Sequence, residues 1–320
     1  MACIVLALPL AAQTTNNGMI TGTVLDAQGA VVPGASVTVT DVDRNTSLST
    51  TTDGAGVFLF PQLLPATYTV TVEKAGFQKF MQRDVVLNIN ARLSLGAITL
   101  AVGEMVQTVE VTAQGLQLQT ESAERAPTII GTQLQNIEVD GRSALSLMRT
   151  MPGVVFNMDT SRAKNRIENI NINGARMNSL NATLNGTSVT GTGDNTKLMV
   201  TVSMDSLQEF KVLASNYQAQ YGKSAGGTIM MMTKSGGKDF HGSGYWYYRD
   251  KGLNANDWAK NRDNIAKSSY HYNYFGYTVG GPAYIPGKFN TGKDRLFFFW
   301  SEEYQRQLIP EGIRRITVPT

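Results

Sequence analysis

The uneven distribution of aromatic residues constrains the fold of this chain more than any other feature of its sequence. Eighteen of the 27 aromatic residues lie from Phe240 onward, in stretches such as YWYY, YHYNYFGY and LFFFW. Within YFGYTVGG, Phe275, Tyr277 and Val279 occupy every second position, which is the period of a β-strand. Such strands occur in membrane barrels with aromatic girdles, in aromatic-rich soluble β-domains, and in platforms for sugars or single-stranded nucleic acid. The pattern predicts strands and leaves these classes open.

Charge and cysteine content exclude several kinds of protein. The 320 residues carry a formal net charge of +3, with 28 Lys and Arg against 25 Asp and Glu, and no run of like charges could follow a phosphate backbone. We therefore expect no nucleic-acid partner. The only cysteine is Cys3, so disulfides and cysteine-based zinc sites are not expected in the mature chain.

The N-terminal apolar segment CIVLALPLAA resembles a signal peptide. Small residues precede Gln13, and cleavage after Ala12 would make residues 1–12 a signal-peptide remnant. The basic residues that usually precede such a segment are missing, so a buried strand or helix is the alternative. No apolar run approaches the ~18 residues of a spanning helix, whereas a barrel strand needs only ~10 alternating residues.

Residues 18–102 predict a small antiparallel β-sandwich. Short β-rich runs are separated by Gly, Pro and Asp, and Pro33-Gly34 and Asp53-Gly54 are typical turn pairs. In ASVTVTDV, Val37, Val39 and Val42 alternate with polar residues, which predicts a half-buried strand. The runs GTVLDAQGAVVPGASVTVTD and TTDGAGVFLFPQLLPATYTVTVEKAGF resemble the carboxypeptidase-regulatory-like domain, which implies a transthyretin-like or Ig-like sandwich.

Residues 103–118 are interpreted as a linker that contains one short strand. In GEMVQTVEVTAQG, Val109 and Val111 alternate with Thr108, Glu110 and Thr112. This strand resembles a TonB box, the segment by which outer-membrane receptors bind the periplasmic protein TonB. The resemblance implies that TonB contacts Thr108, Val109, Glu110, Val111, Thr112 and Ala113. The alternative is that TVEVTA is the last strand of the sandwich.

Residues 119–235 mix helical and strand patterns. Ser143 stands where it can cap a helix that presents Leu147, Met148 and Met151 on one side, and Pro152-Gly153 would end it. Asp205 is expected to cap a short helix that runs through Glu209, with a strand from Phe210. Gly226-Gly227 would allow close backbone packing before the apolar run TIMMMT.

Two segments of this region resemble the plug of Oar-like TonB-dependent outer-membrane receptors. They are INGARMNSLNATLNGTSV, in which Asn185 stands where Asp is commoner, and the stretch from VSMDSLQEFKVL to HGSGYWYYRD. The resemblance implies a mainly β multidomain protein: the sandwich, an α/β plug, and the first strands of an incomplete antiparallel outer-membrane β-barrel over residues 236–320.

Motifs that could support catalysis or metal binding are weak. GKFNTGKD nearly matches a phosphate-binding loop, but Asp294 replaces the Ser or Thr that would hold magnesium, and aromatic strands flank it. The only histidines, His241 and His271, lie outside the sandwich and 30 residues apart, and a zinc carboxypeptidase needs two histidines and a glutamate. We expect no enzymatic activity, metal or cofactor.

The resemblance implies TonB-dependent uptake of a ligand across the outer membrane of a Gram-negative bacterium. The expected partners are TonB, membrane lipid around the complete barrel, and an unidentified small ligand such as a siderophore, glycan or peptide. The sandwich would lie in the periplasm. Two other functions remain open from the residues: a surface adhesion or structural protein, and a carbohydrate-binding module of a secreted enzyme.

Overall fold

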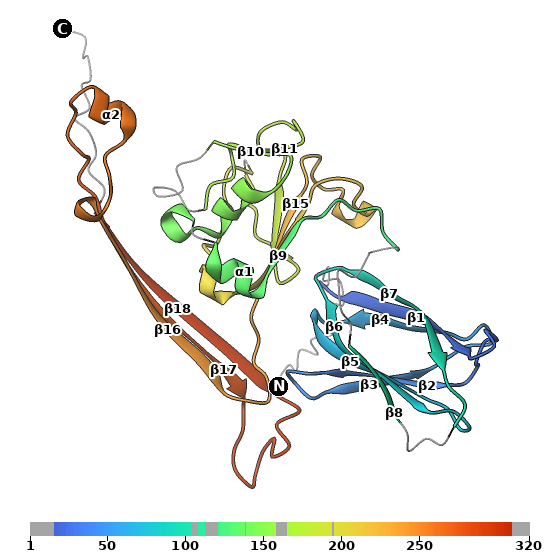
Figure 1. Ribbon diagram of the computed structural model, residues 1–320. Coiled ribbons are helices and arrows are strands. Elements are labelled where there is room, and N and C mark those ends of the chain that lie inside the picture. The colour runs from blue at the N-terminus through green and yellow to red at the C-terminus, as the bar shows by residue number, and fades with distance from the viewer. Residues whose placement is uncertain are drawn as a thin grey trace, which may run out of the picture.

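The computed structural model describes residues 16–103, 108–112, 121–137, 139–157, 165–193 and 195–308. It contains a β-sandwich, an α/β unit and a three-stranded sheet in chain order (Figure 1). This confirms the mainly β, multidomain fold class expected from the sequence. The expected signal-peptide remnant, residues 1–12, lies outside the described residues.

Two sheets form the sandwich. One has the strand order β4–β1–β7, with β1 (Gly18–Asp26), β4 (Val57–Leu63) and β7 (Arg92–Leu100). The other has the order β3–β2–β5–β6–β8, with β2 (Ser36–Asp41), β3 (Ser47–Thr51), β5 (Ala66–Glu73), β6 (Lys79–Leu87) and β8 (Thr108–Thr112). The pairs β1–β7 and β6–β8 are parallel, and the other neighbours are antiparallel. Alternate side chains of both sheets are buried in one apolar core.

Strand β2 shows how the alternating pattern gives this core and where it stops. Val37 and Val39 are buried, as expected, but the third inward residue is Asp41, and Val42 is 43% exposed. The expectation for Val42 was wrong because β2 ends at Asp41, whose carboxylate turns the chain by accepting hydrogen bonds from the backbone N–H groups of Asp43 (2.9 Å) and Arg44 (3.0 Å).

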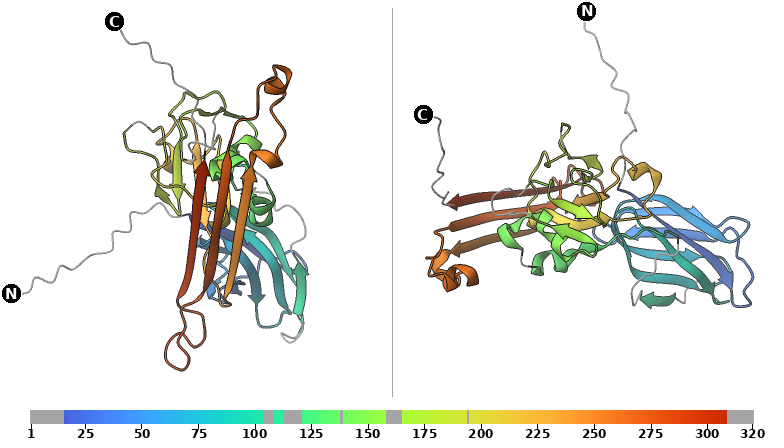
Figure 2. Two further views of the ribbon diagram at one scale, coloured as in Figure 1. Left: turned by 90° about the vertical axis from the view of Figure 1, so that its left-hand side faces the viewer. Right: turned by 90° about the horizontal axis from the view of Figure 1, so that it is seen from above.

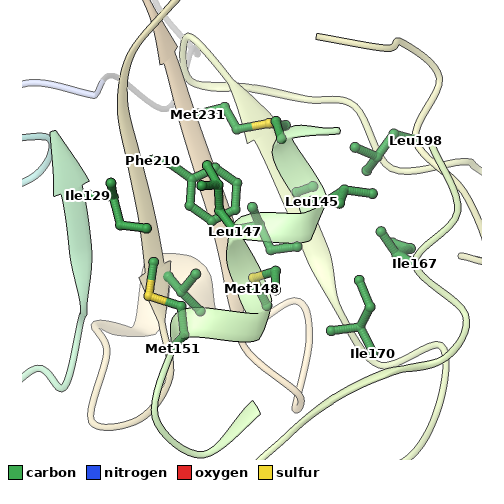
Figure 3. Close-up of a cluster of buried hydrophobic side chains, with 14 of the residues drawn as sticks. Ile129, Leu145, Leu147, Met148, Met151, Ile167, Ile170, Leu198, Phe210 and Met231 are labelled. Atoms are coloured by element: carbon green, nitrogen blue, oxygen red, sulfur yellow. The ribbon is translucent and has the colours of Figure 1, made fainter. Parts of the chain in front are cut away.

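The α/β unit is built on a five-stranded sheet of order β13–β12–β15–β14–β9. These strands are β9 (Thr128–Ile130), β12 (Asn181–Leu184), β13 (Thr187–Ser188), β14 (Leu207–Leu213) and β15 (Thr228–Thr233). A separate pair joins β10 (Val154–Phe156) to β11 (Ile170–Ile172). The helical elements are α1 (Gly131–Asn136), η1 (Asp140–Arg142), η2 (Ala144–Thr150), η3 (Met204–Ser206) and η4 (Ala219–Tyr221). Figure 3 shows the core on one face of the sheet, where Leu145, Leu147 and Met148 of η2 approach Phe210 and Met231.

Two expectations for helices in this unit need correction. The segment after Ser143 forms a 3₁₀ helix, and the Ser143 side chain makes no capping hydrogen bond to it, although the helix ends before Pro152 as expected. Asp205 lies inside the single turn η3, and the chain is already a strand at Leu207, so no helix runs to Glu209. Pairing of β14 with both β15 and β9 outweighs the local helix signal.

The close packing expected at Gly226-Gly227 is confirmed. A Cβ atom on Gly226 would lie 2.8 Å from the carbonyl oxygen of Ser179, and one on Gly227 would lie 2.6 Å from that of Leu213. Gly227 also has a φ of +102°, a conformation that other residues rarely adopt. Glycine at both positions lets β15 lie between β12 and β14.

The last sheet contains three long antiparallel strands, β16 (His241–Asp250), β17 (His271–Pro282) and β18 (Phe297–Leu308). Side chains of β17 alternate as expected: Tyr272 and Tyr274 are buried, whereas Tyr277 and Val279 are exposed. The loop between β16 and β17 carries η5 (Lys251–Leu253) and α2 (Trp258–Arg262). Figures 1 and 2 show that this loop and the sandwich lie at opposite ends of the strands.

Among the residues that the structure describes, no helix has the length and apolar character needed to cross a membrane.

Candidate functional site

The strand expected to bind TonB, β8, is the outermost strand of the larger sandwich sheet. It pairs in parallel with β6, from Thr108 opposite Lys79 to Thr112 opposite Arg83. The expected linker strand is therefore part of a sheet, as the alternative interpretation had it, and one of its edges has no neighbouring strand in the described structure. Five of the six residues expected to contact TonB lie in β8, and Ala113 lies outside the described residues.

The side chains of Val109 and Glu110, the two in β8 that the structure describes, are largely exposed. Val109 is 39% exposed. Glu110 forms an ion pair with Arg83 at 2.7 Å, but both side chains are about half exposed, so the pair contributes little to stability. Consecutive peptide groups of a strand point to opposite edges, and therefore about half of the backbone groups of β8 face the edge without a neighbour. This edge can accept another strand.

A second group of polar residues joins the α/β unit to the three-stranded sheet. Arg142 forms an ion pair with Asp205 of η3, and its guanidinium lies 3.7 Å from the centroid of the Tyr247 ring on β16. Arg142 has a φ of 51° and follows Gly141, whose φ is 68°. This uncommon backbone turns the side chain toward β16. No pattern in the sequence indicated a role for Arg142.

A hydrogen-bonded cluster lies beside these contacts. Together they form a polar seam between the α/β unit and the three-stranded sheet. The Ser203 hydroxyl donates to Glu303 Oε2 of β18 at 3.0 Å, and Tyr245 of β16 donates to the same oxygen at 3.2 Å. The Ser203 and Tyr245 hydroxyls also lie 3.2 Å apart, so one residue of the α/β unit contacts two strands of the sheet. The two parts are held together by specific polar contacts.

A hollow lies between the same two parts, on the side of the seam toward the α2 loop. Its volume is about 560 Å³. Its wall contains two arginines and four tyrosines: Arg142, Arg249, Tyr247, Tyr248, Tyr272 and Tyr274. Guanidinium groups and aromatic rings with hydroxyls can bind planar, anionic or hydroxylated compounds.

The motifs that resemble phosphate or metal sites lie in the last sheet, as their flanking strand patterns predict. GKFNTGKD is a loop between β17 and β18, and the side chain of Asn290 organises it by donating to the carbonyl oxygens of Ala283 and Leu296, each at 3.0 Å. His241 pairs with Gly280 and His271 pairs with Asp250, so the two histidines lie at opposite ends of the β16–β17 hairpin. They are too far apart to share one metal ion.

Family comparisons assign a domain to each of the three parts. Residues 19–101 match the carboxypeptidase regulatory-like domain, residues 127–229 match the TonB-dependent receptor plug domain, and residues 232–320 match an outer membrane β-barrel domain. These matches follow the order of the sandwich, the α/β unit and the three-stranded sheet.

Comparisons with individual proteins give more distant similarities. The TonB-dependent transporter Oar of Myxococcus xanthus is 27% identical over 302 residues, which cover 88% of this chain and 26% of that protein. The chain thus spans about a quarter of the length of this relative. The structure of the siderophore receptor PirA from Acinetobacter baumannii has 18% sequence identity and a TM-score of 0.39, over 56% of this chain and 24% of PirA. The ferric enterobactin receptor PfeA from Pseudomonas aeruginosa has 19% identity and a TM-score of 0.37, over 52% of this chain and 23% of PfeA. With its regulatory-like, plug and barrel domains in this order, the chain belongs to the TonB-dependent outer-membrane receptors.

Proposed function

We propose that this protein takes up a ligand across the outer membrane with energy delivered by TonB. The plug would occupy the lumen of the complete barrel, and the seam formed by Arg142, Ser203 and Glu303 would hold it against the wall. The sandwich and the α2 loop lie at opposite ends of the barrel strands, which supports a periplasmic sandwich and an outward-facing loop. Adhesion or carbohydrate binding by a secreted enzyme gives no role to the plug.

The observation that carries this proposal is the placement of β8 directly before the plug with one edge open. TonB would bind by adding a strand of its own to this edge, so that backbone hydrogen bonds provide most of the affinity. The open edge makes this possible without removal of β8 from β6. Residues Thr108 to Ala113 remain the proposed contact segment.

Proline substitutions in β8 test the proposal. The amides of Val109 and Glu110 point to opposite edges, so one of them faces TonB and the other faces β6. We expect either Val109→Pro or Glu110→Pro to weaken binding of a purified TonB C-terminal domain by about tenfold or more in calorimetry, because proline removes a donor and blocks the strand ladder. Val109→Ala, the matched control, only trims contact area and should change affinity by less than about threefold.

Thermal unfolding of each variant shows whether the sandwich stays folded. Equal affinity of the wild type and both proline variants would show that TonB does not pair with β8. TVEVTA would then be only the last strand of the sandwich.

The hollow lined by Arg142 and Arg249 supports a path for the ligand on the outward side of the plug. We propose that its tyrosines and arginines contact the ligand during passage. A siderophore, a glycan and a peptide all carry groups that such a wall can bind.

A further inference from the structure

Both faces of the plug sheet are buried, and different parts of the chain cover them. On one face, Phe210 and Val212 of β14 and Ile229 and Met231 of β15 belong to the plug's own core. On the other face, Leu213, Met230 and Met232 form a separate apolar cluster with Tyr221 and with Ile89 of the sandwich. Burial on both faces explains why TIMMMT reads as an uninterrupted apolar run.

Two charged side chains of β14 bind the backbone of one sandwich residue. The carboxylate of Glu209 accepts a hydrogen bond from the N–H group of Ile89, at 2.9 Å and 3.1 Å to its two oxygens. Lys211 Nζ donates to the carbonyl oxygen of the same residue at 2.7 Å. Ile89 lies two residues after the end of β6, and all three residues are at least 97% buried.

This pair of contacts is not incidental surface pairing, because both side chains are buried and burial of two charged groups is expensive unless each has a partner. Burial raises the pKa of Glu209 to about 7, against the hydrogen bond from Ile89 and the charge of Lys211, which lower it. Burial lowers the pKa of Lys211, whereas the charges of Glu209 and Glu124 raise it. Without the sandwich, the two charges would gain water and the backbone groups of Ile89 would lose their partners.

Further contacts surround this pair. Arg92 at the start of β7 donates to Gln218 Oε1 at 3.0 Å. The turn after β2 reaches the segment between plug and barrel, where the N–H group of Lys238 donates to the carbonyl oxygen of Asp43 at 2.8 Å and Arg44 donates to Ser235. The sandwich therefore contacts the plug and the start of the barrel at three places.

We propose that the sandwich covers this face of the plug sheet, where Glu209 and Lys211 hold it by the backbone of Ile89. When the plug is remodelled, the sandwich leaves this face as one unit. The sandwich is then an interaction partner of the plug with a defined binding site, and more than a module tethered by a linker. This docking rests on its own contacts and goes beyond the proposed binding of TonB.

Cysteine labelling of adjacent residues on β15 tests the cover. In a Cys3→Ser background, which has no other cysteine, one variant carries Met230→Cys and another carries Met231→Cys. Met230 faces the sandwich and Met231 faces the plug core, and both are about 1% exposed or less. The rate of reaction with a maleimide is measured in the full 320-residue chain in detergent micelles.

Ile89→Asp breaks the contact from the sandwich side, because it buries a carboxylate against Glu209 and the apolar cluster. Lys211→Met breaks it from the plug side with a side chain of similar length. The matched control is Val86→Asp, which makes the same type of change at an exposed position of β6. We expect each docking variant to raise the labelling rate at position 230 by about tenfold or more and to leave position 231 within about twofold, and the control to change neither.

Two results would overturn the proposal. If position 230 remains as protected in Ile89→Asp and Lys211→Met as in the wild type, the docked sandwich is not what covers this face. If positions 230 and 231 gain reactivity to the same extent, the sandwich does not leave separately from unfolding of the plug.

Discussion

Gly22 of β1 should be replaceable only if Phe58 on the neighbouring strand changes with it. The two residues are register partners in the β1–β4 pair, and Phe58 is 1% exposed. A Cβ atom on Gly22 would lie 2.7 Å from Cζ and 2.8 Å from Cε1 of the Phe58 ring, closer than real Cβ contacts occur. Because the ring is fully enclosed by the sandwich core, Gly22→Ala must shift the ring or the strand.

The magnitude follows from two opposing effects. Overpacking of a core typically costs about 1–3 kcal/mol. Replacement of glycine by alanine returns about 0.4–1 kcal/mol, because it restricts the unfolded chain. We therefore expect Gly22→Ala to lower the free energy of unfolding by about 1–2 kcal/mol, which shifts the urea midpoint by roughly 1 M for a domain of this size.

A double-mutant cycle on the fragment of residues 16–112 measures this contact. Phe58→Leu removes the two ring atoms nearest to the added Cβ, so Gly22→Ala should become neutral or stabilising in that background, with a coupling energy of about 1–2 kcal/mol. The control is Gly54→Ala, where an added Cβ would have no atom within 4 Å. Two results would contradict a clash with the Phe58 ring: Gly22→Ala behaves like this control, or its cost is the same with Leu at position 58.

The remaining predictions concern metal independence and pH. Residues 16–112 contain neither His nor Cys, so we expect this fragment to unfold cooperatively with a midpoint that a chelator does not change; a midpoint that falls with chelator would contradict this. Because the pKa of Glu209 is raised from 4.5 to about 7 in the folded chain, its contribution to stability is complete below pH 4.5 and is lost as the pH rises through 7. Between about pH 5.5 and pH 8 the free energy of unfolding should fall by roughly 2 kcal/mol more in the wild type than in Glu209→Gln. Urea unfolding at both pH values measures this difference. Equal pH dependence of the two proteins would mean that Glu209 is not the titrating group.

The strands of the sandwich and of the barrel part can be recognised in the sequence where like residues recur on one face of a sheet. Val37 and Val39, or Tyr277 and Val279, show this in their spacing of two. Sequence patterns failed at Glu209, which looked like the end of a helix, because the partner of Glu209 lies 120 residues away in the chain. A local pattern cannot contain such a contact.

A signal for the docking site was nevertheless present. Glu209 and Lys211 share one face of a strand whose other residues are mostly apolar, and a fully buried strand leaves no solvent for charged groups. Two charges at a spacing of two within such a strand indicate a polar partner. The strand β8 is a different case, since five residues of alternating pattern suit both a linker and a sheet edge.

The charged contact to Ile89 has a consequence for how this domain arrangement can evolve. Glu209 and Lys211 bind main-chain atoms, which every residue except proline provides in full. Position 89 can therefore drift among apolar residues in relatives while the contact survives. Glu209 and Lys211 on β14 have no such freedom. If a lineage loses the gene segment that encodes the sandwich, we expect it to replace both residues, together with the apolar residues at positions 230 and 232.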